Sequence, residues 1–162
     1  ALTGHLVFST LHTNDAPGAV TRLIDMGVEP FLLASSLEAV LGQRLVRSIC
    51  PHCKEAYKPD ENLIKNLNGS VNTMKGKTFY HGTGCNECGQ TGMSGRLGIF
   101  EMLRINVKLR ELIAGKPTTE QIIKCAPADH IGMVHDGITK VLAGQTTPEE
   151  VFRVAKTITD ED

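Results

Sequence analysis

The sequence predicts an α/β fold that carries a small metal-binding subdomain and ends in a helical subdomain. Three observations lead to this fold class. An apolar, β-rich run over residues 5–11 precedes helical periodicity, four cysteines stand in two close pairs, and the C-terminal part shows a strand pattern followed by four helical stretches. With 162 residues, of which 41% are hydrophobic, the chain can bury a core in one domain or two small ones.

The first part of the chain, residues 1–49, has the pattern strand, helix, helix. The run 5–11 is almost continuously apolar, as are the buried strands of parallel sheets. Asn14 or Asp15 is a good N-cap for the helix that follows, and Gly27 ends that helix. A second helix is predicted over residues 30–47. Its apolar stripe consists of Phe31, Ala34, Leu37, Leu41 and Leu45. These elements form the tail of an α/β layer, which is too small to fold alone.

Two C-x-x-C pairs give the strongest chemical signal. They are formed by Cys50, Cys53, Cys85 and Cys88. A gap of two residues lets both thiolates of a pair turn onto one ion, and two pairs complete a tetrahedral zinc shell with no position open for substrate. Residues 50–95 are therefore predicted to be a tetracysteine zinc-binding subdomain, in which structural zinc replaces a core. The spacer between the pairs is long, but doubling a loop costs only ~0.6 kcal/mol, against ~10–16 kcal/mol for structural zinc.

The cysteine pattern alone leaves other uses open. Two disulfides would need an oxidising compartment, and a thioredoxin-like redox pair needs one C-x-x-C at a strand-to-helix junction. An iron–sulfur cluster uses the same ligands. A zinc hydrolase needs an open metal position, which four thiolates do not leave.

A partial phosphate-loop pattern, Gly76-Lys77-Thr78, lies within the same segment. The full pattern requires a glycine five residues earlier, where Val71 stands, and no strand precedes it. We therefore predict that it binds no phosphate.

The last part of the chain, residues 96–162, is predicted to be a strand followed by a helical subdomain. The strand covers 97–103, and the helices lie near 107–114, 118–125, 130–143 and 148–158. Thr147-Pro148-Glu149-Glu150 is a capping box with proline at the first helical position. The predicted domains are thus 1–49, 50–95 and 96–162.

Charge and cysteine usage limit the expected partners and compartment. The net charge of −1 lacks the excess of positive charge that is typical of nucleic-acid-binding proteins. No apolar run approaches the ~20 residues of a membrane span. The fifth cysteine, Cys125, is predicted to be a buried inert thiol. An odd thiol without a recognisable export signal favours the cytoplasm. Because the chain starts without Met and inside a strand pattern, we expect it to be a fragment of a longer protein.

Histidines flank the first predicted strand at positions 5 and 12. A histidine at the carboxyl end of a strand in an open α/β sheet lies where ligands bind, so His12 is a candidate site residue with His5 as its support. Thr10 can hold water or phosphate through its hydroxyl. From the residues alone, a hydrogen-bonded structural histidine and a strand threonine bonded to a neighbour remain alternatives.

Several runs occur together in the order of one protein family. They are residues 1–15, 22–34, 43–47 followed by Cys50, 95–101, and 136–151. Residues 1–15 resemble the histidine box of the type II secretion and type IV pilus assembly ATPases, and the other runs are similar to later parts of the same family. The resemblance covers essentially the whole chain. The double C-x-x-C resembles the extension or secretion branch rather than the pilus-retraction branch.

The resemblance implies a RecA-like P-loop ATPase that works as a cytoplasmic homo-hexamer with ATP and Mg²⁺. Residues 1–49 would then be the C-terminal remnant of the RecA-like domain. The family's phosphate loop, acidic Asp box and Walker B segment lie upstream of the histidine box, and none of them is in this chain. Since these parts hold the phosphates and Mg²⁺, we expect ATP hydrolysis from the parent protein and none from the fragment alone.

The resemblance also implies roles for single residues. His12 would sense the nucleotide at its γ-phosphate, supported by His5 and Thr10. Arg44, which with Arg47 is expected on the helix before the first cysteine pair, would reach a neighbouring subunit's nucleotide. A solvated face or a local salt bridge is the alternative for both arginines.

The zinc subdomain is expected to contact inner-membrane platform proteins of the secretion or pilus machine. This contact would place the parent at the inner face of the bacterial cytoplasmic membrane through partners, without direct insertion. The competing interpretation is a stand-alone zinc-ribbon module that binds nucleic acid or protein. Two Tyr, five Phe and no Trp argue against base stacking. A steep loss of nucleic-acid affinity with rising salt would support the nucleic-acid-binding interpretation.

Overall fold

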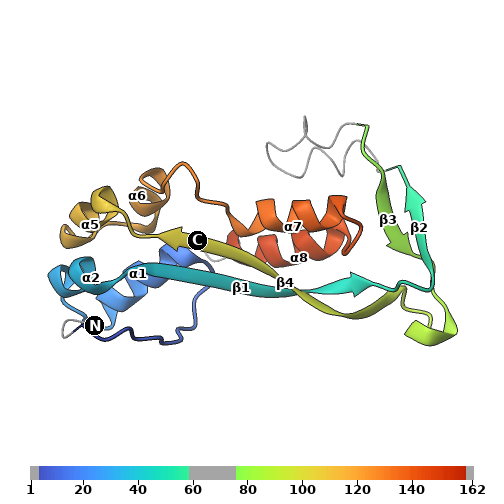
Figure 1. Cartoon of the computed structure of the whole chain (residues 1–162), viewed down its shortest axis with the longest axis horizontal. Helices are drawn as coiled ribbons and strands as arrows, with labels where there is room; N and C mark the ends of the chain where they lie inside the picture. The colour runs from blue at the N-terminus through green and yellow to red at the C-terminus, as the bar shows by residue number, and fades with distance from the viewer. Residues whose placement is uncertain (1–3, 59–75, 160–162) are drawn as a thin grey trace. The chain divides into compact units, whose positions relative to one another are not determined.

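The structure is a computed structural model that describes residues 4–58 and 76–159, with side chains described as far as residue 154. Its elements in chain order (Figure 1) are α1 (Ala16–Asp25), α2 (Pro30–Ser36), β1 (Ala39–Ile49), β2 (Lys54–Tyr57), β3 (Phe79–Gly82), the short 3₁₀ helix η1 (Asn86–Cys88), β4 (Met93–Arg104), α5 (Val107–Ala114), α6 (Thr119–Lys124), α7 (Met133–Leu142) and α8 (Pro148–Thr159). The mixture of helices and strands agrees with the predicted α/β class, whereas a RecA-like origin stays a prediction.

Two compact units divide the chain by packing. Unit 1 consists of residues 1–43 and 100–133, and unit 2 consists of residues 44–99 and 134–162. The long strands β1 and β4 pair with each other, and each contributes residues to both units. This grouping differs from the predicted domains 1–49, 50–95 and 96–162, because it joins segments that are distant in the sequence.

Unit 1 is held by an apolar core in which α1, α2, α5 and α6 meet the end of β4. The buried residues of this core are Ala16, Val20, Leu33, Ala34, Leu103, Ile105, Leu109, Ile113 and Ile122. Helix α2 packs against α5, and α1 packs against α6. The predicted start of α1 is confirmed, since the Asp15 carboxylate accepts the N–H of Gly18 at 2.6 Å. Helices α5 and α6 also lie where the sequence predicts them.

The predicted helix over 30–47 is wrong beyond Ser36. Leu37 leaves the helix with an extended backbone, and β1 begins at Ala39. Exposure then alternates with a period of two along β1, and pairing with β4 supplies its hydrogen-bond partner. The apolar residues Leu41 and Leu45 fit both a helical and a strand period, so tertiary pairing decides between them. Arg44 and Arg47 consequently lie on a strand and not on a helix.

The predicted buried strand over residues 5–11 is also not formed. Leu6, Val7 and Phe8 are 77%, 61% and 86% exposed, and the segment has no assigned secondary structure. A strand needs a neighbour for its N–H and C=O groups. In the described part of the chain, the two sheets are β1–β4 and β2–β3, and neither includes this segment.

Unit 2 contains a small hairpin and two helices. Strands β2 and β3 are antiparallel, with Lys54 opposite Gly82 and Tyr57 opposite Phe79. Phe79 is fully buried against α7 and α8 in a core completed by Ile138, Val141 and Val151. The strand predicted over 97–103 forms the later part of β4, and α7 and α8 match the last two predicted helices within a few residues.

Two further predictions change in the structure. Cys125, predicted to be buried, is exposed at the C-cap of α6. Ile122 is the residue of α6 that faces the core, and Cys125 follows it by three residues, past the helix end. The predicted capping box at α8 also has a different use, because the Glu150 carboxylate accepts from Arg47 and Arg153.

Candidate metal centre and histidine segment

The four cysteines of the two C-x-x-C pairs come together in unit 2. Cys50 follows the end of β1, Cys53 precedes β2, Cys85 is the N-cap of η1 and Cys88 is its last residue. Their sulfur atoms all lie within 4.8 Å of one another, as expected for Cys50, Cys53, Cys85 and Cys88. Pairing of β2 with β3 is what brings the first pair to the second across the long spacer.

The spacing of the sulfur atoms fits one tetrahedral ion. The Sγ–Sγ distances are 3.8 Å for Cys50–Cys85, 3.9 Å for Cys53–Cys88 and 3.7 Å for Cys85–Cys88. A regular tetrahedron with zinc–sulfur bonds of about 2.3 Å has an edge of about 3.8 Å. A disulfide would need about 2.0 Å. The donor set thus fits a mononuclear thiolate site, and the two disulfides left open by the sequence are not formed.

Backbone N–H groups point at three of the sulfurs. Gly84 donates to Cys53, and Gly92 donates to Cys88, each at 3.3 Å. Cys85 and Cys88 donate to each other's sulfur across η1. Cys50 is fully buried, whereas the other three cysteines are half-buried. Such donors stabilise negative charge on sulfur, which a set of four thiolates around a divalent ion requires.

The thiol pKa values reflect this arrangement in the metal-free chain. Partial burial raises the pKa of Cys53 to about 12. Burial acts in the same direction on Cys88, but the backbone N–H groups of Cys85 and Gly92 outweigh it, and the pKa of Cys88 falls to about 6. Cys88 therefore carries thiolate character near neutral pH and is the sulfur best prepared to bind a cation.

Two glycines allow the segments around the two C-x-x-C pairs, here called the knuckles, to approach each other closely. A Cβ on Gly82 would stand 1.9 Å from the carbonyl oxygen of Gly92, and a Cβ on Gly92 would stand 2.3 Å from that of Gly82. The Cys50 N–H also donates to the Gly92 carbonyl at 3.0 Å. The end of β3 and the turn after η1 thus approach more closely than any side chain allows.

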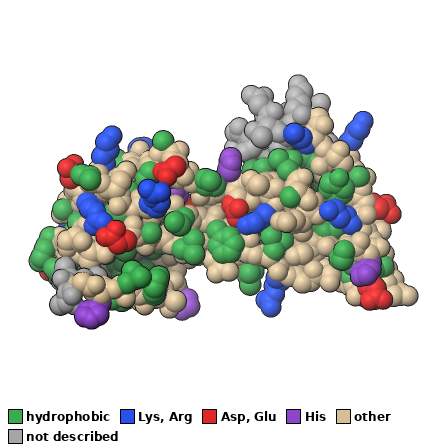
Figure 2. All heavy atoms as spheres, in the orientation of Figure 1, with side chains coloured by type: hydrophobic (Ala, Val, Ile, Leu, Met, Phe, Trp, Pro, Cys, Tyr) green, Lys and Arg blue, Asp and Glu red, His purple; other side chains and the backbone are tan. Residues whose placement is uncertain are grey.

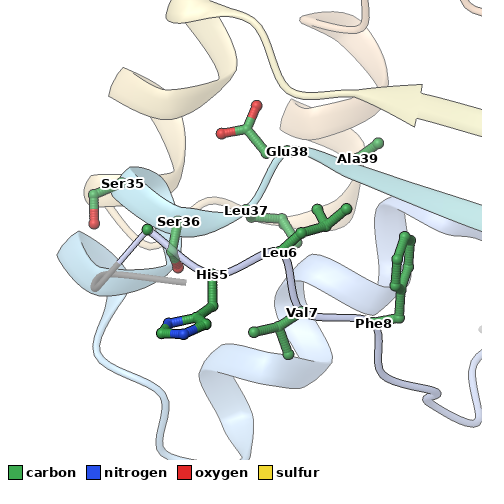
Figure 3. A pocket seen from close by; sticks show the side chains of 10 residues that line it. His5, Leu6, Val7, Phe8, Ser35, Ser36, Leu37, Glu38 and Ala39 are labelled. Carbon is green, nitrogen blue, oxygen red and sulfur yellow. The ribbon is translucent and has the colours of Figure 1, made fainter.

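The histidine segment is in unit 1. His5, Thr10 and His12 are all exposed. His5 lies beside an open hollow of about 440 Å³ between the extended segment 4–8 and the end of α2 (Figure 3). After His12, the chain turns into α1, and the Thr13 hydroxyl donates to the Asp15 carbonyl at 3.2 Å. His5, Thr10 and His12 belong to unit 1, whereas Arg44 belongs to unit 2.

Arg47 has a defined partner in unit 2. Its guanidinium donates through Nε at 3.0 Å and through Nη2 at 2.8 Å to one oxygen of Glu150, and its backbone N–H donates to the other oxygen at 2.9 Å. Burial of Glu150 acts to raise its pKa, but the Arg47 and Arg153 hydrogen bonds dominate and lower it to about 2. This pair joins α8 to β1. Of the two alternatives for Arg47, the structure supports a salt bridge, although the partner is distant in the sequence and not local.

Sequence reasoning missed two long-range pairs, Arg47–Glu150 and Glu101–His130. The partners are separated by 103 and 29 residues. No local pattern predicts such pairs. The one available signal was a carboxylate inside an apolar strand, since Glu101 lies between Ile99 and Leu103 on the buried face of β4.

Positively and negatively charged side chains both occur over each unit on the face shown in Figure 2, and neither kind forms a continuous patch there. None of the described helices is long and apolar enough to cross a membrane.

Comparison with known proteins places the chain in a class of bacterial transport machinery. Residues 1–153 match the family described as Type II/IV secretion system protein, and the chain belongs to this family.

Its relatives include ATPases. The chain is 47% identical over 156 residues to the Type II secretion system protein E of Pseudomonas aeruginosa and to the Type II secretion system ATPase E of Vibrio cholerae. It is 46% identical over 159 residues to the Type IV pilus assembly ATPase PilB of Thermus thermophilus. These matches cover 96%, 96% and 98% of this chain, but only 31%, 31% and 18% of the relatives.

Proposed function

We propose that this chain is the C-terminal region of a hexameric cytoplasmic ATPase that powers type II protein secretion or type IV pilus assembly. The observation that carries the proposal is the family match over residues 1–153, together with relatives named as secretion and pilus ATPases. The chain has no phosphate loop of its own, so ATP and Mg²⁺ would bind in the whole protein through segments outside this chain.

The role proposed for the tetracysteine centre is structural zinc binding. Cys50, Cys53, Cys85 and Cys88 would hold the ion, and sulfur spacings of 3.7 to 3.9 Å support this. Zinc with four thiolates keeps no open position, so it would contribute folding energy rather than catalysis. The knuckles and the β2–β3 hairpin would then be the rigid surface that contacts inner-membrane platform proteins.

The role proposed for the histidine segment is nucleotide sensing. His12 would approach the γ-phosphate, with His5 and Thr10 beside it, and Arg44 would reach the nucleotide of a neighbouring subunit. His12, His5 and Thr10 are exposed at the surface of unit 1, which supports contact with ligand or with further protein. The exposed apolar residues Leu6, Val7 and Phe8 support burial of this segment against another part of the whole protein.

Steady-state ATP hydrolysis tests the proposal. The isolated chain is expected to be inactive, and the whole protein active. In the whole protein, His12→Gln should lower turnover by at least about tenfold, within the range known for losing one hydrogen-bond donor to a developing charge. His135→Gln is the matched control, since His135 is an exposed histidine on α7. Turnover by the isolated chain, or equal turnover of His12→Gln and wild type, would contradict the proposal.

A further inference from the structure

A buried polar cluster in unit 1 has no part in the roles described so far. Glu101, on β4, is 7% exposed. One of its oxygens accepts the backbone N–H of Ala16 at 2.9 Å, and the other lies 3.1 Å from Nε2 of His130. Nδ1 of the same ring lies 3.2 Å from the Met102 carbonyl oxygen. The cluster thus joins β4, the start of α1 and the segment before α7.

Both ring nitrogens of His130 lie within hydrogen-bond distance of an oxygen, and the tautomer of the ring decides which nitrogen donates. The side chains of His130 and Glu101 are 16% and 9% exposed. This largely buried contact holds the Glu101 carboxylate in place.

The carboxylate of Glu101 accepts a hydrogen bond from one of the backbone N–H groups that have no partner within the helix at its start. Asp15 accepts the Gly18 N–H at 2.6 Å, and Pro17 has no N–H. Glu101 supplies the acceptor for Ala16 from 85 residues away. Gly42, on β1, lies beside this contact, since a Cβ there would stand at an ordinary van der Waals distance of 3.5 Å from the Ala16 nitrogen.

The helix start is continuous with the histidine segment. The Thr13 hydroxyl donates to the Asp15 carbonyl, and this turn leads directly into Ala16. His12 itself is exposed. Its position relative to unit 1 therefore depends on how firmly the turn at residues 13–16 is held.

We propose that Glu101 is a positioning residue. It fixes the first turn of α1 to β4 and thereby holds His12 at a defined place, while His130 holds the carboxylate. This inference rests on the proposed nucleotide-sensing role of His12 for its functional meaning, but the positioning itself is a property of unit 1.

Amide hydrogen exchange and ¹⁵N relaxation of the 162-residue chain test the proposal. In Glu101→Ala, exchange at Ala16 should accelerate by about tenfold to a hundredfold, the size expected for a lost buried hydrogen bond to a charged group. Residues 12–15 should become more mobile on the relaxation timescale. In Glu101→Gln, both should stay within about twofold of wild type, because the amide oxygen can still accept from Ala16 and the amide nitrogen can donate to His130.

The matched control is Glu38→Ala. Glu38 is also a unit 1 carboxylate in an ion pair, with Arg110 at 2.8 Å, but its side chain is 73% exposed. We expect no change at α1. The proposal is overturned if Glu101→Ala leaves Ala16 and residues 12–15 unchanged. It is also overturned if protection of α5 and α6 falls as much as that of α1, since Glu101 would then only stabilise unit 1 as a whole.

The measurement uses no nucleotide, so its outcome tests the positioning role separately from the proposed function. Loss of order at residues 12–15 with a fully active His12→Gln whole protein would contradict the sensing role and leave the positioning intact. An ordered segment in Glu101→Ala with an impaired His12→Gln would contradict the positioning alone.

Discussion

At the scale of single residues, the four cysteines differ in their surroundings although they share one centre. Cys50 is fully buried, and Cys88 accepts N–H groups from both Cys85 and Gly92. Burial acts to raise the pKa of Cys88, but these two donors and the contacts with the Cys85 and Cys53 thiols lower it to about 6. The residue pattern predicted which four side chains meet, because C-x-x-C spacing is a local property. The donors could not be predicted, because they depend on the turn geometry around each knuckle.

Replacing Cys88 by serine should abolish stable zinc binding. A hydroxyl is a poor zinc ligand at neutral pH, and loss of a ligand should exceed the ~10–100-fold cost of losing an outer-shell partner. Competition with a chromophoric chelator measures the affinity. Cys125→Ser is the control, since Cys125 is exposed at the end of α6 outside the cluster. Equal zinc affinity for the Cys88 variant and wild type would contradict a four-thiolate site.

The Arg47–Glu150 pair should make stability depend on pH in the acid range. The pKa of Glu150 is about 2 in the folded chain, below the ordinary 4.5. Its stabilising contribution is therefore complete above about pH 5 and is lost as the pH falls towards 2, with a full size of up to about 3 kcal/mol. We expect Glu150→Gln to be destabilised at pH 6 and to approach wild type at pH 3. Urea denaturation of both proteins at each pH measures this, and loss of metal in acid affects both alike. A pH-independent difference would refute the ionic contribution.

At the scale of elements, the close approach of β3 to the turn after η1 determines whether the two knuckles can meet. Gly82 and Gly92 allow backbone contact where a Cβ would clash. The role of these two glycines in a contact between positions ten residues apart became visible only in the structure.

A methyl group at Gly82 should separate the knuckles. We expect Gly82→Ala to lose at least about 1–3 kcal/mol of unfolding free energy, as in other overpacked sites, and to bind zinc more weakly. Gly132→Ala is the matched control, because a Cβ there meets nothing within 4 Å. Thermal unfolding and zinc competition on both variants provide the comparison. Wild-type zinc affinity in Gly82→Ala would show that the approach is not required.

The errors of prediction at this scale have one physical cause. Helices α1, α5 and α6 were predictable from caps and apolar spacing, which act within one segment. The segments at 5–11 and 37–47 depend on whether a distant strand pairs with them. Leu41 and Leu45 found such a partner in β4, whereas Leu6 and Phe8 have none among the described strands.

At the scale of the whole molecule, the two packing units are stabilised differently. Unit 1 has a core of nine buried residues that includes none of the four cysteines. Among the described residues of unit 2, the hydrophobic cluster has four buried members: Phe79, Ile138, Val141 and Val151. A small core of this kind is where a bound metal contributes most to stability. The sequence predicted the metal-stabilised segment but not that α7 and α8 would complete its unit.

Removal of metal should therefore loosen unit 2 selectively. With a strong chelator, we expect amide protection of β2 and β3 to fall to near zero, while α5 in unit 1 keeps its protection. Hydrogen exchange with and without chelator measures both in one sample, and re-addition of zinc should restore β2 and β3. Parallel loss of protection in both units would argue against a local structural role.

Metal content combined with the Co²⁺ spectrum tests the central claim most directly. The chain purified without chelators is expected to contain about one zinc ion, and its Co²⁺ form to show the absorbance of a tetrahedral tetrathiolate site. Purified chain without bound metal, or a Co²⁺ spectrum with fewer than four sulfur ligands, would contradict the account in which Cys50, Cys53, Cys85 and Cys88 enclose one structural ion.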